Sequence, residues 1–271
     1  MMDVTIGQFL PGDSIMHRTD PRVKICLTLF AIVLLFAADN FGALALIAGL
    51  ILLGILLSKI PIKLYLKSIK AVIFIVIFTS VLNIFYGTGE PLAQFWVFKI
   101  TKNGIFNSIF ISTRIIALIL ASSVLTFTTS PTQLTDAIER LLKPLAAIRV
   151  PVHEFAMMMT IALRFVPLLL EETDKIMRAQ KARGADMESG GILQRIKAMI
   201  PVLIPLFVSA FRRAYDLATA MESRCYHGGK GRTKMKILKM GRVDVCVLTV
   251  TALSLAAFLV LNRLLPPTIM M

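Results

Sequence analysis

The sequence predicts an all-α integral membrane protein. Hydrophobic residues make up 56% of the 271 positions, more than one soluble core of this size needs. The mean hydropathy of +0.78 supports the same class. Several uncharged stretches also approach the roughly 20 helical residues that cross about 30 Å of hydrocarbon. These three observations predict about five transmembrane helices plus three long helices on the cytoplasmic side.

The five predicted transmembrane helices lie between charged or polar boundaries. They are Lys24 to Asp39, Asp39 to Lys59, Ala71 to Tyr86, Gly104 to Phe127, and Asp244 to Arg263. The first is short, but Asp20 and Pro21 supply a helix N-cap and a first-turn proline. We expect Lys24 to extend its ammonium group toward the membrane surface.

Arg114 is the one ionisable residue deep within a predicted span. A charge in hydrocarbon is costly, so such a residue is a functional candidate. The alternative is structural, with the side chain at a helix interface or directed toward the surface. The sequence leaves both alternatives open.

The positions of lysine and arginine predict the orientation, because positively charged loops stay in the cytoplasm. With the N-terminus inside, 26 of the 30 basic residues are cytoplasmic, and 19 of these lie between Thr129 and Arg242. This predicts a multi-pass cell-membrane protein in three parts: 1–128 with four spans, a cytoplasmic or interfacial domain at 129–242, and 243–271 with the last span.

The net charge of +14 favours binding to anionic lipids or acidic partners. No aromatic residues interleave the charges as nucleic-acid binding would require.

The segment 129–242 contains two shorter apolar runs, Phe155 to Leu170 and Ala198 to Phe211. At 16 and 14 residues, they have the length of buried or interfacial helices. If both crossed the membrane instead, six basic residues between them would lie outside, against the charge rule. We therefore predict cytoplasmic helices, with two additional spans as the alternative.

Three helices are expected in this segment. Ser130 to Gln133 forms a capping-box pattern with Pro131 at the first helical position, followed by leucines at helical spacing. A second helix is predicted from Val152 to Arg183, and a third from Ile192 to about Tyr226. Glycine follows both long helices and predicts their ends.

No catalytic or metal-binding pattern is present in the sequence. The chain has no G-x-x-x-x-G-K-[ST] phosphate-binding loop, and GGKGRT at 228–233 has the wrong spacing. His153, His227 and Cys225 are too isolated for a metal site. We therefore predict a non-catalytic protein without a metal or other cofactor.

Two similar phrases end the two long helices. AQKARGADM and AMESRCYHGG place Arg183 and Arg224 between small residues, 41 positions apart. An arginine offers a planar set of donors for carboxylates and carbonyls, and small neighbours allow a partner's backbone to approach. The alternative is a helix C-cap arginine that only complements the helix dipole. Two instances at matching helix ends favour docking.

These phrases resemble the Ala-Arg-Gly signatures of the transmembrane coupling subunit, or T component, of energy-coupling factor (ECF) transporters, which are ABC-type importers. The first signature matches at Ala182, Arg183 and Gly184, and the second departs at Ser223, Arg224 and Cys225. The opening PGDSIMHRTDPRVK is also similar to the family's beginning. The unlike signatures suggest two docking ends that are not equivalent.

The resemblance implies that the two signatures bind two cytosolic ABC-type ATPase subunits, identical or different. The membrane helices and the apolar halves of the long helices would hold a substrate-binding membrane subunit, the S component. The chain would couple ATP hydrolysis by its partners to uptake of a vitamin or related micronutrient. Its partners would then be these subunits and membrane lipids, without nucleic acid.

Two other functions remain as alternatives. A membrane-bound enzyme could use the basic cytoplasmic domain to bind phosphorylated or lipid substrates, but it would need a catalytic constellation. A self-sufficient channel or secondary transporter would need polar residues within several spans and an internal repeat. Co-purification of two ATPases distinguishes the coupling subunit from both.

Overall fold

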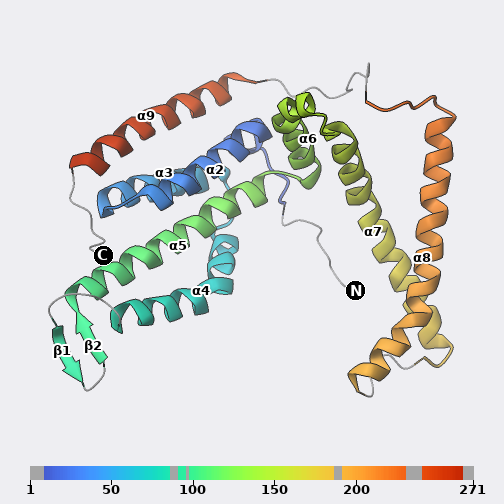
Figure 1. Cartoon of the computed structure of the whole chain (residues 1–271), viewed down its shortest axis with the longest axis horizontal. Coiled ribbons are helices and arrows are strands. Elements are labelled where there is room, and N and C mark those ends of the chain that lie inside the picture. Colours follow the sequence, from blue (N-terminus) through green and yellow to red (C-terminus); the bar gives the residue numbers. More distant parts are fainter. Residues whose placement is uncertain (1–8, 86–90, 96–97, 186–190, 230–239, 265–271) are drawn as a thin grey trace. The chain divides into compact units, whose positions relative to one another are not determined.

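The computed structural model describes residues 9–85, 91–95, 98–185, 191–229 and 240–264, and almost all of them are helical (Figure 1). The helices are α1 (Ile15–Arg18), α2 (Pro21–Ala37), α3 (Phe41–Ser58), α4 (Ile62–Phe85), α5 (Lys102–Thr128), α6 (Pro131–Leu142), the 3-10 helix η1 (Lys143–Ile148), α7 (Val152–Ala182), α8 (Ile192–Glu222) and α9 (Arg242–Leu264). A short antiparallel hairpin of β1 (Pro91–Phe95) and β2 (Phe98–Thr101) joins α4 to α5. The predicted all-α membrane class is confirmed, and the hairpin is an addition that we did not predict.

The chain forms two compact units. One unit contains residues 1–137 and 237–271, and the other contains residues 138–236. The three-part division at 128 and 242 concerns placement in the membrane and stays a prediction.

The first unit is built around α5, which packs against α2, α3 and α4. Leu35, Leu44 and Phe110 are fully or almost fully buried where α2, α3 and α5 meet. The Phe41 ring packs edge-to-face against Phe110, with the ring centroids 5.2 Å apart. Such a small aliphatic and aromatic core leaves most of the apolar surface of α4 exposed, as a lipid-facing helix requires.

Polar contacts attach both ends of α9 to this unit. At the start of α9, Asp244 accepts a 2.7 Å hydrogen bond from the main-chain N–H of Asp20. At the other end, Asn262 Oδ1 accepts from the main-chain N–H of Asp39 at 3.2 Å. Helix α9 is therefore positioned by its ends, next to the starts of α2 and α3.

The second unit is dominated by α7 and α8, which run in opposite directions and pack against each other (Figure 1). Near the end of α7, Gln180 Nε2 donates to the carbonyl of Pro201 at 3.4 Å. Further along, Arg213 of α8 forms an ion pair with Glu172 of α7. Both helices continue through their internal prolines, although proline removes one main-chain donor at each site.

Several predicted helix limits agree closely with the observed ones, but α4 begins at Ile62, nine residues before the span predicted from Ala71. The capping box before α6 is confirmed, because Ser130 N–H donates to Gln133 Oε1 and Gln133 N–H to Ser130 Oγ, both at 3.3 Å. Helix α7 begins at the predicted residue and ends one residue early, and α8 ends at Glu222, four residues before the predicted limit.

The expectation for Lys24 was wrong. Lys24 is buried, and its ammonium group donates to the carbonyl of Thr128 at 2.9 Å and to Thr129 Oγ1 at 3.2 Å. The end of α5 supplies these acceptors inside the protein. The side chain therefore satisfies its charge by internal hydrogen bonds instead of extending to the membrane surface.

Six helices in the described part of the chain are long and apolar enough to cross a membrane: α3, α4, α5, α7, residues 193–222 of α8, and α9. Helix α2, predicted as the first span, is 17 residues long. Length and composition thus admit α7 and α8 as spans as well. The cytoplasmic placement of both rests on the charge distribution and stays a prediction.

Candidate docking site

The first signature forms the C-terminal end of α7. Arg183 is the C-cap residue and Gly184 follows with a left-handed φ of +87°. The N–H of Gly184 donates to Lys181 O at 3.0 Å, and that of Ala185 donates to Gln180 O at 3.0 Å. This pair of bonds is the Schellman arrangement, which satisfies the last carbonyls of a helix.

The second signature forms the corresponding end of α8. Ser223 is the C-cap residue, and Cys225 has a left-handed φ of +54°. The N–H of Cys225 donates to Glu222 O at 2.9 Å, and that of Tyr226 donates to Met221 O at 3.1 Å. The hydrogen-bond pattern is that of the α7 end, shifted by the 41 positions that separate the two arginines.

The two signatures are therefore equivalent in backbone conformation although their sequences differ. The third residue of each, Gly184 or Cys225, takes the left-handed conformation that ends a helix. Glycine adopts this conformation without steric cost, whereas a residue with a Cβ atom is disfavoured there. A non-equivalence of the two ends, which the unlike residues suggested, is not found in the backbone.

Both signatures are accessible in the second unit. All six residues, Ala182, Arg183, Gly184, Ser223, Arg224 and Cys225, are exposed. A Cβ atom built at Gly184 has nothing within 4 Å. Each arginine thus stands at a helix end with only small side chains beside it, which leaves the main chain open to a partner.

The arginines lie at opposite ends of the α7–α8 pair. A Cβ atom at Gly229 would lie 2.3 Å from His153 Cδ2, so the segment after α8 returns to the beginning of α7. Arg224 is only five residues from that contact, whereas Arg183 is at the far end of the 31-residue helix α7. From the rise of a helix and the reach of an extended chain, the two arginines are at least about 20 Å apart.

Helix α8 also exposes an apolar stripe. Its members recur at steps of three and four residues, which places them on one helix face: Leu193, Ile196, Ile200, Ile204, Phe207, Phe211 and Tyr215. Phe155, Met158 and Met159 are exposed on the first half of α7. Exposed apolar surface of this extent marks contact with lipid or with another protein.

Arg114 is not part of this site. In the first unit its Nη2 donates to the carbonyl of Ala38, and its guanidinium group lies 4.8 Å from the centroid of the Phe110 ring. These contacts place Arg114 at the turn between α2 and α3. Of the two alternatives that the sequence left open, the structure supports the helix-interface role.

A buried polar cluster in the first unit was missed in the sequence. It contains Asp20, Lys24 and Asp244, and it joins the beginnings of α2 and α9 to the end of α5. The only local signal was an acid or lysine at the edge of a predicted span. Which of these charged residues meet depends on contacts between segments more than 100 residues apart.

Together these features define a multi-pass helical membrane protein with a pair of long, partly apolar helices that end in matching arginine signatures. Comparison with known proteins identifies the family. The family model described as cobalt transport protein (CbiQ) matches residues 12–235. The chain belongs to this family.

Similar proteins cover almost the whole chain. The energy-coupling factor transporter transmembrane protein EcfT of Ruminiclostridium cellulolyticum is 51% identical over 92% of this chain and 93% of its own length. The EcfT proteins of Clostridium kluyveri and Bacillus subtilis are 49% and 46% identical, each over 97% of this chain and over 97% and 100% of their own lengths. The resemblance stated from the signatures is thereby confirmed, and the chain is a transmembrane component of an ECF-type transporter.

Proposed function

We propose that the chain couples ATP hydrolysis by two cytosolic ABC-type ATPase subunits to substrate uptake. The observation that carries the proposal is the equivalence of the ends of α7 and α8 around Arg183 and Arg224. Two identical backbone arrangements, at opposite ends of a helix pair, suit two similar partners. A single helix end with an arginine would carry no such implication.

The chemistry of each end supports docking into a groove. The guanidinium group offers five N–H donors in a rigid plane, which can bind carboxylates and carbonyls of a partner. The small side chains of Ala182 and Ser223 permit a close approach of the partner's backbone on each side. On assembly these arginines would become desolvated, and their hydrogen bonds would then be worth much more than those of an exposed capping residue.

The apolar stripe of α8 and the exposed apolar residues of α7 are the proposed contact with a substrate-binding membrane subunit. The stripe begins at Leu193 and reaches Tyr215, two residues beyond the contact between Arg213 and Glu172. A movement of either signature end would therefore be transmitted along a helix that also forms the substrate-subunit contact. ATP-driven closure of the ATPase pair would shift α7 against α8 and release or reorient that subunit.

The proposal extends to the substrate class and to the non-catalytic role. The relatives are named as transmembrane proteins of energy-coupling factor transporters, and the matching family is named for cobalt transport. We propose uptake of a vitamin or related micronutrient, with hydrolysis performed by the partner ATPases. The N-terminus and the unit containing α7 and α8 would face the cytoplasm.

Substitution of the arginines tests the docking. Arg183→Ala and Arg224→Ala should each weaken ATPase co-purification, because truncating one partner of a desolvated charged hydrogen bond costs about 2 to 5 kcal/mol. Exposed Arg178 of α7 and exposed Arg212 of α8 are matched controls. Arg→Lys at each signature should rescue binding only partly, because the planar donor set is lost.

The outcome also separates docking from helix capping. A capping arginine contributes about 1 kcal/mol or less, so its loss would leave co-purification almost unchanged. Unchanged binding of both ATPases and unchanged uptake in the double variant would overturn the proposal. An equal effect of Arg178→Ala would point to a general need for positive charge.

A further inference from the structure

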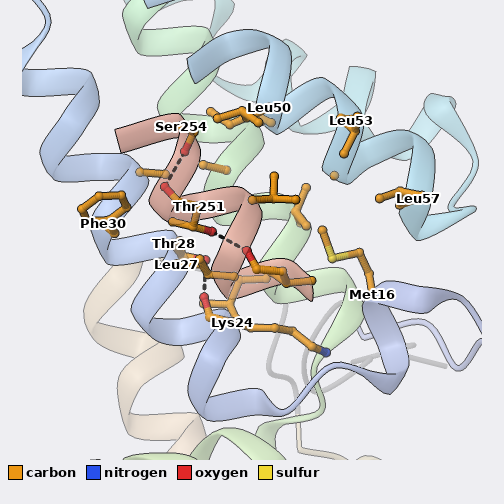
Figure 2. A pocket seen from close by; sticks show the side chains of 18 of the residues that line it. Met16, Lys24, Leu27, Thr28, Phe30, Leu50, Leu53, Leu57, Thr251 and Ser254 are labelled. Carbon is orange, nitrogen blue, oxygen red and sulfur yellow. Dashed lines mark hydrogen bonds between the residues drawn. The ribbon is translucent and has the colours of Figure 1, made fainter. Parts of the chain in front are cut away.

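An elongated cavity of about 530 Å³ lies within the first unit, between α2, α3, α5 and α9 (Figure 2). Its lining extends along α9 from Arg242 to Ser254, which corresponds to about 18 Å of helix. Half of a bilayer's hydrocarbon core is about 15 Å thick. The cavity is therefore about as deep as one membrane leaflet.

The walls of the cavity offer hydrocarbon and few polar contacts. The four hydroxyl groups of its lining donate within their own helices: Thr28 to Lys24 O at 2.9 Å, Thr251 to Val247 O at 2.8 Å and Ser254 to Thr251 O at 2.7 Å (Figure 2), and Thr128 to Val124 O at 2.7 Å. The remaining wall residues are mainly leucine, isoleucine and valine. A polar group between these walls would lose its hydrogen bonds to water and gain few from the protein. The part of a ligand that lies there must therefore be apolar.

Basic residues are found at one end of the cavity. Lys24 lines this end, and its ammonium group donates hydrogen bonds to Thr128 O and Thr129 Oγ1. Arg242, the first residue of α9, also lines this end and is exposed. A ligand with a hydrocarbon chain and a negative group at one end matches this distribution.

The two nearby carboxylates form contacts with groups other than Arg242. Asp244 accepts hydrogen bonds from the main-chain N–H groups of Asp20 and Gly241, and Asp20 forms an ion pair with Arg22. Both carboxylates are thus occupied within the buried cluster. Arg242 supplies the positive charge at the exposed mouth.

The cavity also has an accessible side. Three of its apolar lining residues are about half exposed: Ile15 at 47%, Leu53 at 50% and Val250 at 48%. A hydrocarbon chain that lies against the protein from the bilayer could enter the cavity along this exposed side.

We propose that this cavity binds one acyl chain of an anionic phospholipid, with the phosphate group at Arg242. The lipid would fill the space beneath the middle of α9, whose two ends are attached by Asp244 and Asn262. The site belongs to the first unit and does not depend on ATPase docking. Under the predicted topology, the lipid would come from the cytoplasmic leaflet.

A photoactivatable lipid tests the site. The purified full-length chain is placed in nanodiscs of phosphatidylcholine with a minor fraction of phosphatidylglycerol that carries a diazirine on one acyl chain. We expect crosslinks to residues of the α3 and α9 walls, such as Leu50 and Val247. Crosslinks only to helix faces outside the cavity would overturn the proposal.

Filling the cavity provides the decisive variant. Gly54 lines it, and a Cβ atom there would approach only the flexible end of Met16, at 3.2 Å. Gly54→Leu should reduce cavity crosslinking at least about tenfold, because excluding even two methylene groups changes binding by that factor. The matched control is Gly49→Leu in the same helix, since a Cβ atom at Gly49 has nothing within 4 Å.

A second filling variant guards against a folding defect. Ser254→Leu fills the cavity from α9, and its crosslinking should fall in the same way while the protein elutes as a single species. Undiminished cavity crosslinking in either folded variant would contradict the proposal.

Arg242→Gln should abolish the preference for phosphatidylglycerol over phosphatidylcholine as competitor, whereas Arg242→Lys should retain it. Equal competition by the two unlabelled lipids in the unmodified protein would overturn the role of Arg242.

Discussion

The main-chain N–H of Asp20 donates a 2.7 Å hydrogen bond to Oδ1 of Asp244, although 224 residues separate the two. The other oxygen of Asp244 accepts from the N–H of Gly241 at 2.7 Å. Asp244 is only 2% exposed. One carboxylate thus caps the start of α9 and holds it against the start of α2.

Replacing this carboxylate should destabilise the first unit. Asp244→Ala leaves two N–H groups without their acceptor and should lower the free energy of unfolding by about 2 to 4 kcal/mol. Asp244→Asn retains one oxygen and should cost less. Denaturant unfolding in detergent micelles measures both. Exposed Asp216 of α8 is the control, and an equal loss for Asp216→Ala would show that the effect is not specific to the buried contact.

Arg114 should contribute to stability through the turn between α2 and α3. Arg114→Met removes the hydrogen bond to Ala38 O and the contact with the Phe110 ring, with an expected loss of about 2 to 4 kcal/mol. Thermal unfolding measures this loss. If Arg114→Met keeps the stability of the unmodified protein but abolishes uptake in the assembled transporter, the structural role is wrong.

The left-handed residue of each signature should set the strength of the helix end. Cys225→Gly relieves a conformation that costs a residue with a Cβ atom about 1 kcal/mol, and Gly184→Ala introduces that cost. Amide hydrogen exchange at 221–226 should therefore slow in Cys225→Gly. Exchange at 180–185 should accelerate in Gly184→Ala. Cys225→Ala keeps the Cβ atom and should leave exchange unchanged. Slower exchange in Cys225→Ala would contradict the explanation.

Gly229 and His153 should be energetically coupled. Gly229→Ala would bring a methyl group to 2.3 Å from the His153 ring, whose Nδ1 lies 3.0 Å from Glu139 Oε1. We expect a loss of about 1 to 3 kcal/mol from this overpacking. In a His153→Ala background the same substitution should cost much less, because only the contact with Cβ at 3.1 Å remains. A double-mutant cycle by thermal unfolding checks this, and additive effects would show that the two residues do not interact.

The native Cys225 reports the topology. It is exposed in the second unit, so with Cys26 and Cys246 replaced by serine it should react with a membrane-permeant maleimide. Under the proposed orientation, an impermeant reagent outside intact cells should fail to block this reaction. Blocking from outside would place the end of α8 on the external side and contradict the cytoplasmic docking of ATPases.

Local interactions explain why most helix limits could be predicted. The Ser130–Gln133 capping box and Gly184 after α7 act within a few residues of the chain, so their patterns are visible in the sequence. The end of α8 was predicted four residues late, because Cys225 and not the glycines at 228 and 229 takes the left-handed conformation that ends it. The amphipathic spacing of 131–142 likewise depends only on the helical repeat. The two arginine positions were found in the same way, because each signature is a short contiguous phrase at a helix end.

The sequence by itself determined the membrane class, the principal helices and the position of both signatures, because these depend on composition and on contacts between near neighbours. The tertiary structure decided the rest. It buried Lys24 against Thr128, placed Arg114 at the turn after α2, and joined Asp244 to Asp20. Whether a charged side chain extends to the surface or is satisfied internally depends on which distant segment supplies the acceptor, and only packing brings that acceptor within hydrogen-bonding distance.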